Sequence, residues 1–360
     1  MLEVSIRKKL DNFTLETAFS LETGCMGILG ASGCGKSVTL KCIAGILTPD
    51  EGTIRLNGKV LFDSAKKINI RPQERRIGYL FQNYALFPNM TVSENIAAGF
   101  RAEHMKRGDR RELCAARVKE MLVRFSLTEL ADRYPKHLSG GEQQRTALAR
   151  LLVGEPEVLL LDEPFSALDA YLKEELQLEL LETMQRLLMP TVLVTHSRDE
   201  VYRLSSRLMI MDRGMAERPD DTKKLFSSPG SMMAAKLTGC KNIAHVTKCS
   251  DEEYFAGDWN IRFPVSASKA DYIGIRAHDF VPEKEVEDGG LYIPVKISVI
   301  GISEGPFEWN AMIKSSGNPG QKMLWWKVSK EVIKTKAEIK ETKQLYIRKT
   351  GILYLMEKAL

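Results

Sequence analysis

Short apolar runs that alternate with longer amphipathic segments characterise the first 210 residues of the chain. The runs cover residues 26–29, 158–161 and 191–195, and a segment with apolar positions at helical spacing follows each of them. This alternation predicts an α/β fold with a parallel, doubly wound sheet. The runs at 158–161 and 192–194 are continuously apolar, as is typical of strands covered on both faces, so we expect them to be central strands.

Residues 100–157 follow a helical pattern instead. Apolar positions are spaced for helices over residues 111–125 and 142–153, and Ser139 is placed to act as the N-cap of the second helix. We therefore expect a helical subdomain over about residues 86–157, inserted into a first domain that extends over residues 1–236.

The pattern changes after about residue 236. Short β-rich runs at 259–265, 272–275 and 292–300 are separated by Gly, Pro and acidic turns, which predicts a small all-β domain over residues 237–360. Its last part, residues 321–349, is rich in Lys and Arg. Such a run is typical of a lysine-studded edge strand or a solvated helix, and a membrane-surface or nucleic-acid patch is the less favoured interpretation.

Composition excludes several classes of protein. The 360 residues are 44% hydrophobic and 28% charged, which is typical of folded domains and leaves room for two to three of about 150 residues each. The net charge is only +5, and neither half is strongly basic, so we expect no nucleic-acid partner. The six cysteines form no CxxC pair, and no run reaches the roughly 18 apolar residues of a membrane helix. Any work at a membrane would then be that of a peripheral subunit.

The first chemical motif lies between the run at 26–29 and the helix expected from about Val38. It fits G-x-x-x-x-G-K-[ST], the pattern of a phosphate-binding P-loop, in the strand-to-helix context that such a loop needs. We expect its backbone N–H groups to surround phosphate oxygens, Lys36 to reach the β and γ phosphates of ATP, and Ser37 to bind Mg²⁺. A Gly-rich turn that matches by chance is the disfavoured alternative. The motif consists of Gly30, Ala31, Ser32, Gly33, Cys34, Gly35, Lys36 and Ser37.

Two further apolar runs end in polar residues. Asp162 and Glu163 follow the run at 158–161, and His196 follows the run at 191–195. Because parallel strands bring their carboxyl ends to one edge of a sheet, we expect one site there. Asp162 is placed to hold Mg²⁺, Glu163 to orient or deprotonate the attacking water, and His196 to contact the γ-phosphate. Alone, each of these residues would more often be a solvated strand end.

The segment Leu138-Ser-Gly-Gly-Glu-Gln-Gln-Arg145 opens a helix with a second Gly-rich cradle for an anion. It resembles the signature motif of the ATP-binding cassette (ABC) family, and other motifs of that family occur in the same order. The resemblance covers residues 1 to about 235. The matching positions are Phe13 for the aromatic residue that stacks on adenine, Gln82 for the Q-loop, Ser166 to Asp169 for the D-loop, and His196 for the H-switch.

The resemblance implies a P-loop NTPase cassette that hydrolyses ATP with Mg²⁺ as a head-to-tail homodimer. ATP on the P-loop of one subunit would be covered by Ser139, Gly140 and Gly141 of the other. The catalytic residues would be Glu163 and His196. The remaining ATP-binding positions would be Phe13, residues 30–37, Gln82 and Asp169, and the Mg²⁺ ligands would be Ser37, Gln82 and Asp162.

Within the family, the chain resembles the ATPases of importers. Residues 87–96 resemble the region of those proteins that grips a permease, and residues 274–279 resemble a segment of their OB-like, TOBE/MOP-type regulatory domain, with departures at Ala277 and His278. This implies integral-membrane permease subunits, an extracytoplasmic solute-binding protein and a place at the cytoplasmic face of the membrane. Whether the C-terminal domain senses an oxyanion or is structural stays open.

The transported substrate is inferred only from resemblance to importers of known solutes. Residues 237–243 at the domain junction, the short hairpin before the P-loop and residues 71–78 together look most like molybdate importers, so molybdate is the first expectation. Residues 71–78 are shared with sulfate, polyamine and ferric-iron importers, which are the alternatives. A switch protein of the same family acting on nucleic acid or the ribosome is the alternative of another class, and the near-neutral charge and residues 87–96 count against it.

Overall fold

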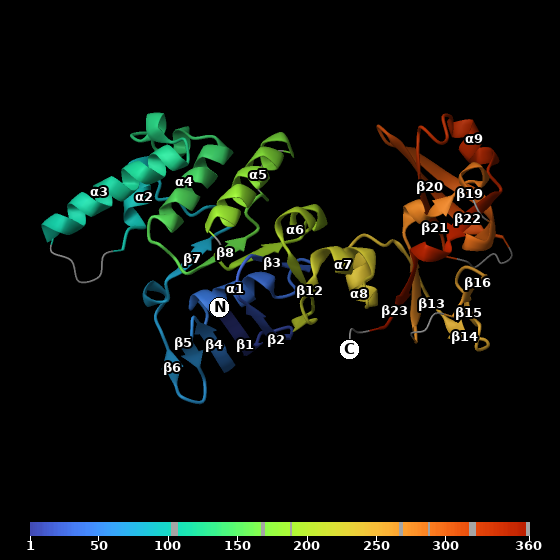
Figure 1. Ribbon diagram of the computed structural model, residues 1–360, viewed down its shortest axis with the longest axis horizontal. Helices are drawn as coiled ribbons and strands as arrows, with labels where there is room; N and C mark the ends of the chain where they lie inside the picture. The colour runs from blue at the N-terminus through green and yellow to red at the C-terminus, as the bar shows by residue number, and fades with distance from the viewer. Residues whose placement is uncertain are drawn as a thin grey trace. The chain divides into compact units, whose positions relative to one another are not determined.

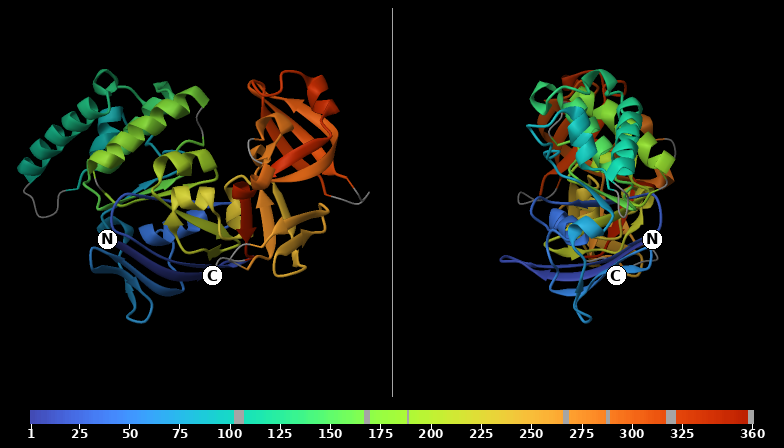
Figure 2. Two further views of the ribbon diagram at one scale, coloured as in Figure 1. Left: turned by 45° about the vertical axis from the view of Figure 1, so that its right-hand side comes forward. Right: turned by 90° about the vertical axis from the view of Figure 1, so that its left-hand side faces the viewer.

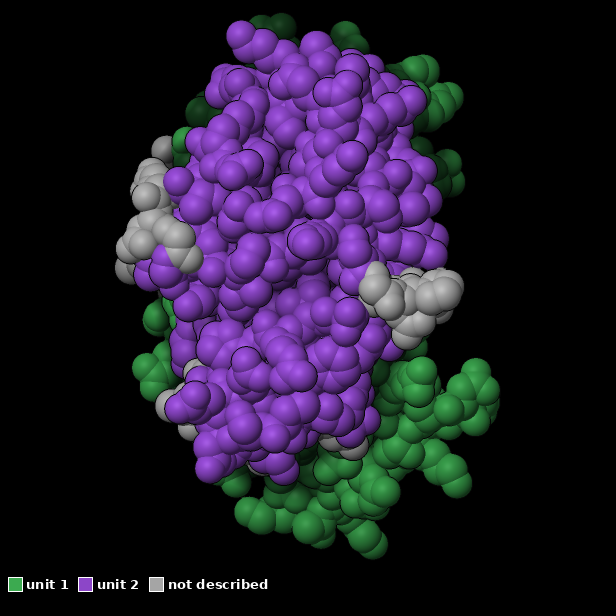
Figure 3. Space-filling view, turned by 90° about the vertical axis from the view of Figure 1, so that its right-hand side faces the viewer, with its two compact units in different colours: residues 1–223 green, residues 224–360 purple. Residues whose placement is uncertain are grey.

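The computed structural model describes residues 1–101, 107–166, 170–187, 189–265, 269–286, 289–316 and 322–357. The chain forms two compact units, residues 1–223 and 224–360 (Figure 3). The units divide before α8 (Met232–Leu237), whereas the sequence suggested a junction after residue 236. The reason is that α8 packs on β17 (Tyr272–Ile275), and its Ala235 shares a small apolar cluster with Cys240 and Leu355 of the second unit.

The first unit contains a mixed sheet, twelve-stranded in the part of the chain described, in which the predicted parallel strands are extended by antiparallel ones (Figure 1). Its N-terminal part is antiparallel because short turns join neighbouring strands. One of these turns is Asn57-Gly58, where both residues have the positive φ angles, 48° and 79°, that a tight hairpin requires. The antiparallel strands are β1 (Leu2–Lys9), β2 (Thr14–Leu21), β4 (Glu51–Leu56), β5 (Lys59–Asp63) and β6 (Ile68–Asn69).

The other part of the sheet is parallel, with the order β10-β3-β9-β8-β7. The short strands β11 (Met215–Ala216) and β12 (Asp220–Asp221) pair antiparallel with β10, and β11 also pairs with β2, which joins the two parts of the sheet. Strands β8 and β9 are buried along their whole length and lie inside the sheet, which confirms the prediction of central strands. The parallel strands are β3 (Cys25–Gly30), β7 (Ile77–Leu80), β8 (Val158–Asp162), β9 (Thr191–Thr195) and β10 (Arg207–Asp212).

Alternate residues of β8 and β9 enter two different cores. Leu160 and Val192 pack on the side of α1 and the antiparallel strands, while Leu161 and Leu193 pack on the side of α2 to α5. Figures 1 and 2 show these helices on the side of the sheet away from β1 and β2. The helices of this unit are α1 (Lys36–Ala44), α2 (Val92–Ala98), α3 (Arg107–Arg124), α4 (Gly140–Leu152), α5 (Ala170–Leu187) and α6 (Arg198–Leu204), and α7 (Thr222–Ser227) crosses the division.

The second unit is mostly β and has its own apolar core. Its largest sheet has the order β18-β22-β19-β20-β21, and because β18 also approaches β21, the sheet nearly closes into a barrel. The helix α9 (Lys336–Glu341) departs from the all-β prediction. The strands of this sheet are β18 (Phe280–Val281), β19 (Tyr292–Glu304), β20 (Glu308–Ser315), β21 (Leu324–Ser329) and β22 (Gln344–Arg348).

Two three-stranded sheets complete the second unit. One has the order β13-β17-β23 and the other β14-β15-β16, and all their pairings are antiparallel. Their remaining strands are β13 (Asn242–His245), β14 (Thr247–Lys248), β15 (Glu253–Ala256), β16 (Ile261–Pro264) and β23 (Ile352–Leu355). Across the described ranges, no helix combines the length and the apolar character needed to cross a membrane.

Candidate functional site

Four segments that are far apart in the sequence meet at the carboxyl edge of the parallel strands. Since β3, β9, β8 and β7 are neighbours and run in the same direction, the residues that follow them lie along one line. These segments are the P-loop after β3, His196 after β9, Asp162 and Glu163 at the end of β8, and Gln82 after β7.

The P-loop is built around close packing that only glycine permits. A Cβ at Gly30 would lie 2.3 Å from the carbonyl oxygen of Met211 and 2.6 Å from Sγ of Cys34, while Gly35 has a φ of 112°. Lys36, which is buried, folds back so that its Nζ donates to the carbonyl oxygens of Gly30, at 2.9 Å, and Ala31, at 3.0 Å. The P-loop therefore holds the ammonium group of Lys36 at its centre, beside the N-terminus of α1.

Asp162 is held from two sides. Its Oδ1 accepts a hydrogen bond of 2.7 Å from the hydroxyl of Ser37, and its Oδ2 accepts one of 2.8 Å from the hydroxyl of Tyr79. Burial, and secondly the neighbouring Asp162, raises the pKa of Tyr79 above its usual value, so this hydroxyl stays a donor. The hydroxyl and carboxylate oxygens gathered here are hard ligands of the kind that Mg²⁺ prefers, so these residues fit that ion.

Glu163 lies between Gln82 and His196. Its Oε2 accepts from Nε2 of Gln82 at 3.4 Å, and its Oε1 is 3.4 Å from Nδ1 of His196. The backbone of Glu163 has a φ of 47°, a left-handed conformation that a non-glycine residue rarely adopts and that is often found at functional sites. The structure thus joins three of the residues singled out from the sequence.

Phe13 lies beside the P-loop. It precedes β2, is partly buried, and is placed so that a Cβ on Gly35 would lie 3.4 Å from its Cε2. Phe13 also packs against the apolar core of the first unit, so its stacking on a nucleotide base stays a prediction.

The signature segment shows the predicted helix start. Ser139 is the N-cap of α4 and exchanges two hydrogen bonds with Glu142: the Ser139 hydroxyl accepts from the Glu142 amide at 3.3 Å, and the Ser139 amide donates to Glu142 Oε2 at 2.7 Å. Gly140 and Gly141 form the first residues of the helix, and Ser139 is exposed. The predicted D-loop residue Asp169 lies outside the described residues.

Tyr79 and Arg75 were missed from the sequence. Arg75 is 1% exposed and ties down the last turn of α1, since its Nη1 donates to the carbonyl oxygens of Cys42, at 3.0 Å, and Ile43, at 2.7 Å. A buried tyrosine on a strand usually finds a hydrogen-bond partner, and that was the available signal for Tyr79. Arg75 lies among the charged residues of 71–76, and nothing in the sequence indicates that it is buried while charged neighbours of it are exposed.

Comparison with known proteins places the chain in a family. A family model described as ABC transporter matches residues 16–166. The spermidine/putrescine import ATP-binding protein PotA of Oleidesulfovibrio alaskensis is 34% identical over 318 residues, which cover 82% of this chain and 80% of that one. The chain belongs to the ABC transporter family, among the ATP-binding proteins of importers.

Two classes of ABC import protein occur among the relatives. PotA of Chromobacterium violaceum is 41% identical over 251 residues, covering 69% of this chain and 67% of that one. The sulfate/thiosulfate import ATP-binding protein CysA of Vibrio cholerae serotype O1 is 41% identical over 244 residues, covering 67% of this chain and 60% of that one. These names support the alternatives predicted from the sequence better than the first expectation, molybdate.

Solved ABC structures match 62% of the chain. A dimeric ATP-binding cassette in a post-hydrolysis state with ADP and Pi has a TM-score of 0.50 and 27% identity, covering 62% of this chain and 99% of that one. The protein cbiO1 of Clostridium perfringens, part of an ABC transporter complex, has a TM-score of 0.53 and 28% identity, covering 62% and 90%. The ABC cassette fold predicted from the motifs is therefore confirmed.

Proposed function

We propose that this chain binds and hydrolyses ATP to drive solute import through a separate membrane permease. The observation that carries the proposal is the meeting of the P-loop, Asp162, Glu163, Gln82 and His196 at one sheet edge. Phosphoryl transfer needs positioned charge and a held water more than covalent chemistry, and this edge supplies a cation, two carboxylates and an imidazole. These residues lie at or just after the ends of four different strands. Chance clustering of polar residues at strand ends does not explain why they meet.

Each residue has a role that its geometry supports. Lys36 and the backbone amides of residues 30–37 bind the phosphates, and Phe13 stacks on the base. Glu163, held between Gln82 and His196, accepts a proton from the attacking water, and His196 contacts the γ-phosphate. A general base must lie within hydrogen-bond reach of the proton it takes, and the carboxylate at the strand end meets that need.

Mg²⁺ would be held by Ser37, Gln82 and Asp162, directly or through water. When bound, the ion neutralises charge on the phosphates. The contribution of the chain itself is to hold Asp162 by hydrogen bonds from Ser37 and Tyr79, so that its carboxylate does not have to be ordered when nucleotide arrives.

We further propose that two copies close around ATP. The exposed Ser139 and the amides of Gly140 and Gly141 form a helix N-terminus suited to the γ-phosphate bound by the partner subunit, and Asp169 would contribute to the same interface. The dimeric form of the matched post-hydrolysis cassette supports this arrangement. ATP then strengthens association and hydrolysis weakens it, which couples the cycle to the permease at the cytoplasmic face.

For the transported solute, we propose a polyamine, or else sulfate or thiosulfate, delivered by a solute-binding protein. The relatives named for spermidine/putrescine and for sulfate/thiosulfate carry this proposal. The cassette residues described above act on ATP in either case, so the choice rests with the permease and the solute-binding protein.

The test is the ATPase of the chain reconstituted in proteoliposomes with its permease and solute-binding protein. Spermidine, putrescine, sulfate, thiosulfate, molybdate and ferric iron are compared. Stimulation by a polyamine, sulfate or thiosulfate supports the proposal, and stimulation by molybdate or ferric iron alone overturns the choice of solute. A complex that hydrolyses ATP but moves no solute, and that instead responds to RNA, would overturn the import function itself.

A further inference from the structure

The guanidinium group of Arg150 holds the segment of backbone that follows Gln82. Arg150 lies in the last turn of α4, at the opposite end of the helix from Ser139. Its Nη2 donates to the carbonyl oxygen of Tyr84 and its Nη1 to that of Ala85, each at 2.8 Å. Hydrogen bonds from a charged donor are stronger than neutral ones, so these two bonds fix the segment to the end of α4.

Tyr84 and Ala85 need such support because both have an unfavourable backbone conformation. Their φ angles are 58° and 46°, in the left-handed region that non-glycine residues rarely adopt. Two successive residues of this kind persist only where the surrounding structure holds them. The fork of the Arg150 guanidinium meets the carbonyl groups of both residues, so we expect the Tyr84-Ala85 turn to depend on it.

The Tyr84-Ala85 turn is also attached to the loop that carries Glu163. Tyr84 is buried, and its hydroxyl donates at 3.2 Å to the carbonyl oxygen of Pro164, the residue after Glu163. Two residues before the turn begins, Nε2 of Gln82 donates to Oε2 of Glu163 at 3.4 Å. That distance is near the upper limit for a hydrogen bond, so a small displacement of the turn would separate the two side chains.

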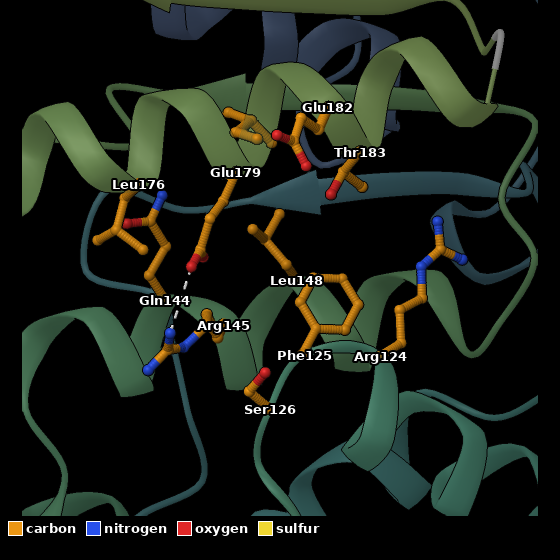
Figure 4. A pocket seen from close by; sticks show the side chains of 11 residues that line it. Arg124, Phe125, Ser126, Gln144, Arg145, Leu148, Leu176, Glu179, Glu182 and Thr183 are labelled. Carbon is orange, nitrogen blue, oxygen red and sulfur yellow. Dashed lines mark hydrogen bonds and ion pairs between the residues drawn. The ribbon is translucent and has the colours of Figure 1, made fainter.

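Close packing fixes α4 to its neighbours at Arg150 and at Arg145. Gly99, just after α2, leaves no room for a Cβ, which would overlap the carbonyl oxygen of Arg150. Nearer the start of α4, Arg145 faces Glu179 of α5 and pairs with it at 3.4 Å (Figure 4). From Ser139 to Arg150 the helix spans about 16 Å, at roughly 1.5 Å per residue. Arg150 therefore moves with the helix that begins at the signature residues.

We infer that Arg150 is a positioning residue that keeps Gln82 in contact with Glu163. The inference rests on the proposed ATPase function, in which Glu163 takes a proton from the attacking water. Arg150 acts on that step only through the Tyr84-Ala85 turn. Because it lies on α4, the helix proposed to cover the ATP of the partner subunit, a shift of that helix would move Gln82 relative to Glu163 in the same chain.

The first test is a double-mutant cycle on the ATPase of the complex with permease and solute-binding protein. Arg150→Met removes both donors, and we expect kcat to fall about tenfold while KM for ATP changes by less than about threefold, since the P-loop is untouched. In the Gln82→Ala background the same substitution should change kcat by less than about twofold, because the side chain that it positions is absent. Arg117→Met, which removes an ion pair with Glu120 on the surface of α3, is the control and should leave kcat unchanged.

Two results would overturn the inference. One is a normal kcat for Arg150→Met in the otherwise unsubstituted protein. The other is the same loss of kcat with and without Gln82, which would show that Arg150 only supports the fold. The proposed function is judged separately: if the unsubstituted complex hydrolyses ATP and Glu163→Gln stops it, that function stands whatever the Arg150 variants do.

Arg150→Lys keeps the inference testable if Arg150→Met does not fold. A lysine ammonium keeps the charge but lacks the planar fork that holds two carbonyl oxygens at once. We expect its kcat to lie about threefold below that of the unsubstituted complex, and this loss should disappear in the Gln82→Ala background. A loss that persists in the Gln82→Ala background, or no loss at all, contradicts the role given to Arg150.

Discussion

The hydroxyl of Tyr79 donates a 2.8 Å hydrogen bond to Oδ2 of Asp162, whose other carboxylate oxygen is bound by Ser37. The two strands involved, β7 and β8, are parallel neighbours, so this contact follows from their register. Both residues are buried, with Tyr79 8% and Asp162 7% exposed. The carboxylate expected to serve Mg²⁺ is therefore oriented by the fold before any ligand binds.

Replacing Tyr79 by Phe removes one donor and leaves a buried carboxylate oxygen unpaired, which costs about 1–3 kcal/mol. We expect weaker Mg²⁺-dependent ATP binding, by about tenfold, with ATP binding in EDTA unchanged. Isothermal titration with and without Mg²⁺ measures both quantities. Tyr354→Phe is the control, because it removes a hydroxyl that donates to a backbone carbonyl in the second unit. Equal loss of binding with and without Mg²⁺ would show that Tyr79 only supports the fold.

Glu163→Gln keeps the contact with Gln82 and removes the proton acceptor. We expect a loss of at least about 100-fold in kcat, since general base catalysis contributes roughly 10²–10⁴-fold. ATP affinity should change by less than about threefold. Steady-state ATPase and equilibrium nucleotide binding check the two values, with the exposed Glu74→Gln as control. A variant that keeps normal turnover would remove Glu163 from the mechanism.

Arg75→Met should destabilise the first unit strongly. The guanidinium holds four acceptors: the carbonyl oxygens of Ile70, Cys42 and Ile43, and Oδ1 of Asn69. Hydrogen bonds to a charged group contribute about 1.5–3 kcal/mol each, so a loss of at least about 3 kcal/mol in the free energy of unfolding is expected.

The neighbouring Arg76 gives a matched control for Arg75. Its ion pair with Glu157 is partly exposed, at 3.2 Å, and such pairs contribute about 0–1 kcal/mol. Urea unfolding followed in the presence and absence of ATP compares Arg75→Met, Arg75→Lys and Arg76→Met. Lys should recover part of the stability, whereas equal effects of Arg75→Met and Arg76→Met would contradict the role given to Arg75.

Buried thiols predict a loss of stability in alkali. Burial raises the pKa of Cys42 to about 11 from the ordinary thiol value of about 9, so the folded state favours the protonated form. This contribution is complete below pH 9 and is lost as the pH rises towards 11. Cys42→Ala should therefore flatten the fall in melting temperature between pH 9 and 11. A slope identical to that of the unsubstituted protein would exclude Cys42 as its source.

Much of the first unit could be predicted, because its central strands are long apolar runs that end in chemically distinctive residues. The contacts of Glu163 with Gln82 and His196 follow from the order of parallel strands, although the sequence does not state that order. Of the antiparallel strands, the hairpin before the P-loop was expected, whereas β4, β5 and β6 were not, because they are short and depend on turns such as Asn57-Gly58. Arg75 escaped notice because its burial depends on the position of α1, which is a tertiary property.

The strand order also determines when the ATP site can exist. Gly27 on β3 pairs with Leu193 on β9, and Leu161 on β8 lies between Leu80 and Leu193. A growing chain therefore makes its P-loop early but cannot complete the site until β9 has left the ribosome. Non-local pairings of this kind are slow to form because long loops must close first. Nucleotide binding is thus a property of the finished first unit. ATP present during synthesis would bind and stabilise only those chains whose first unit is complete.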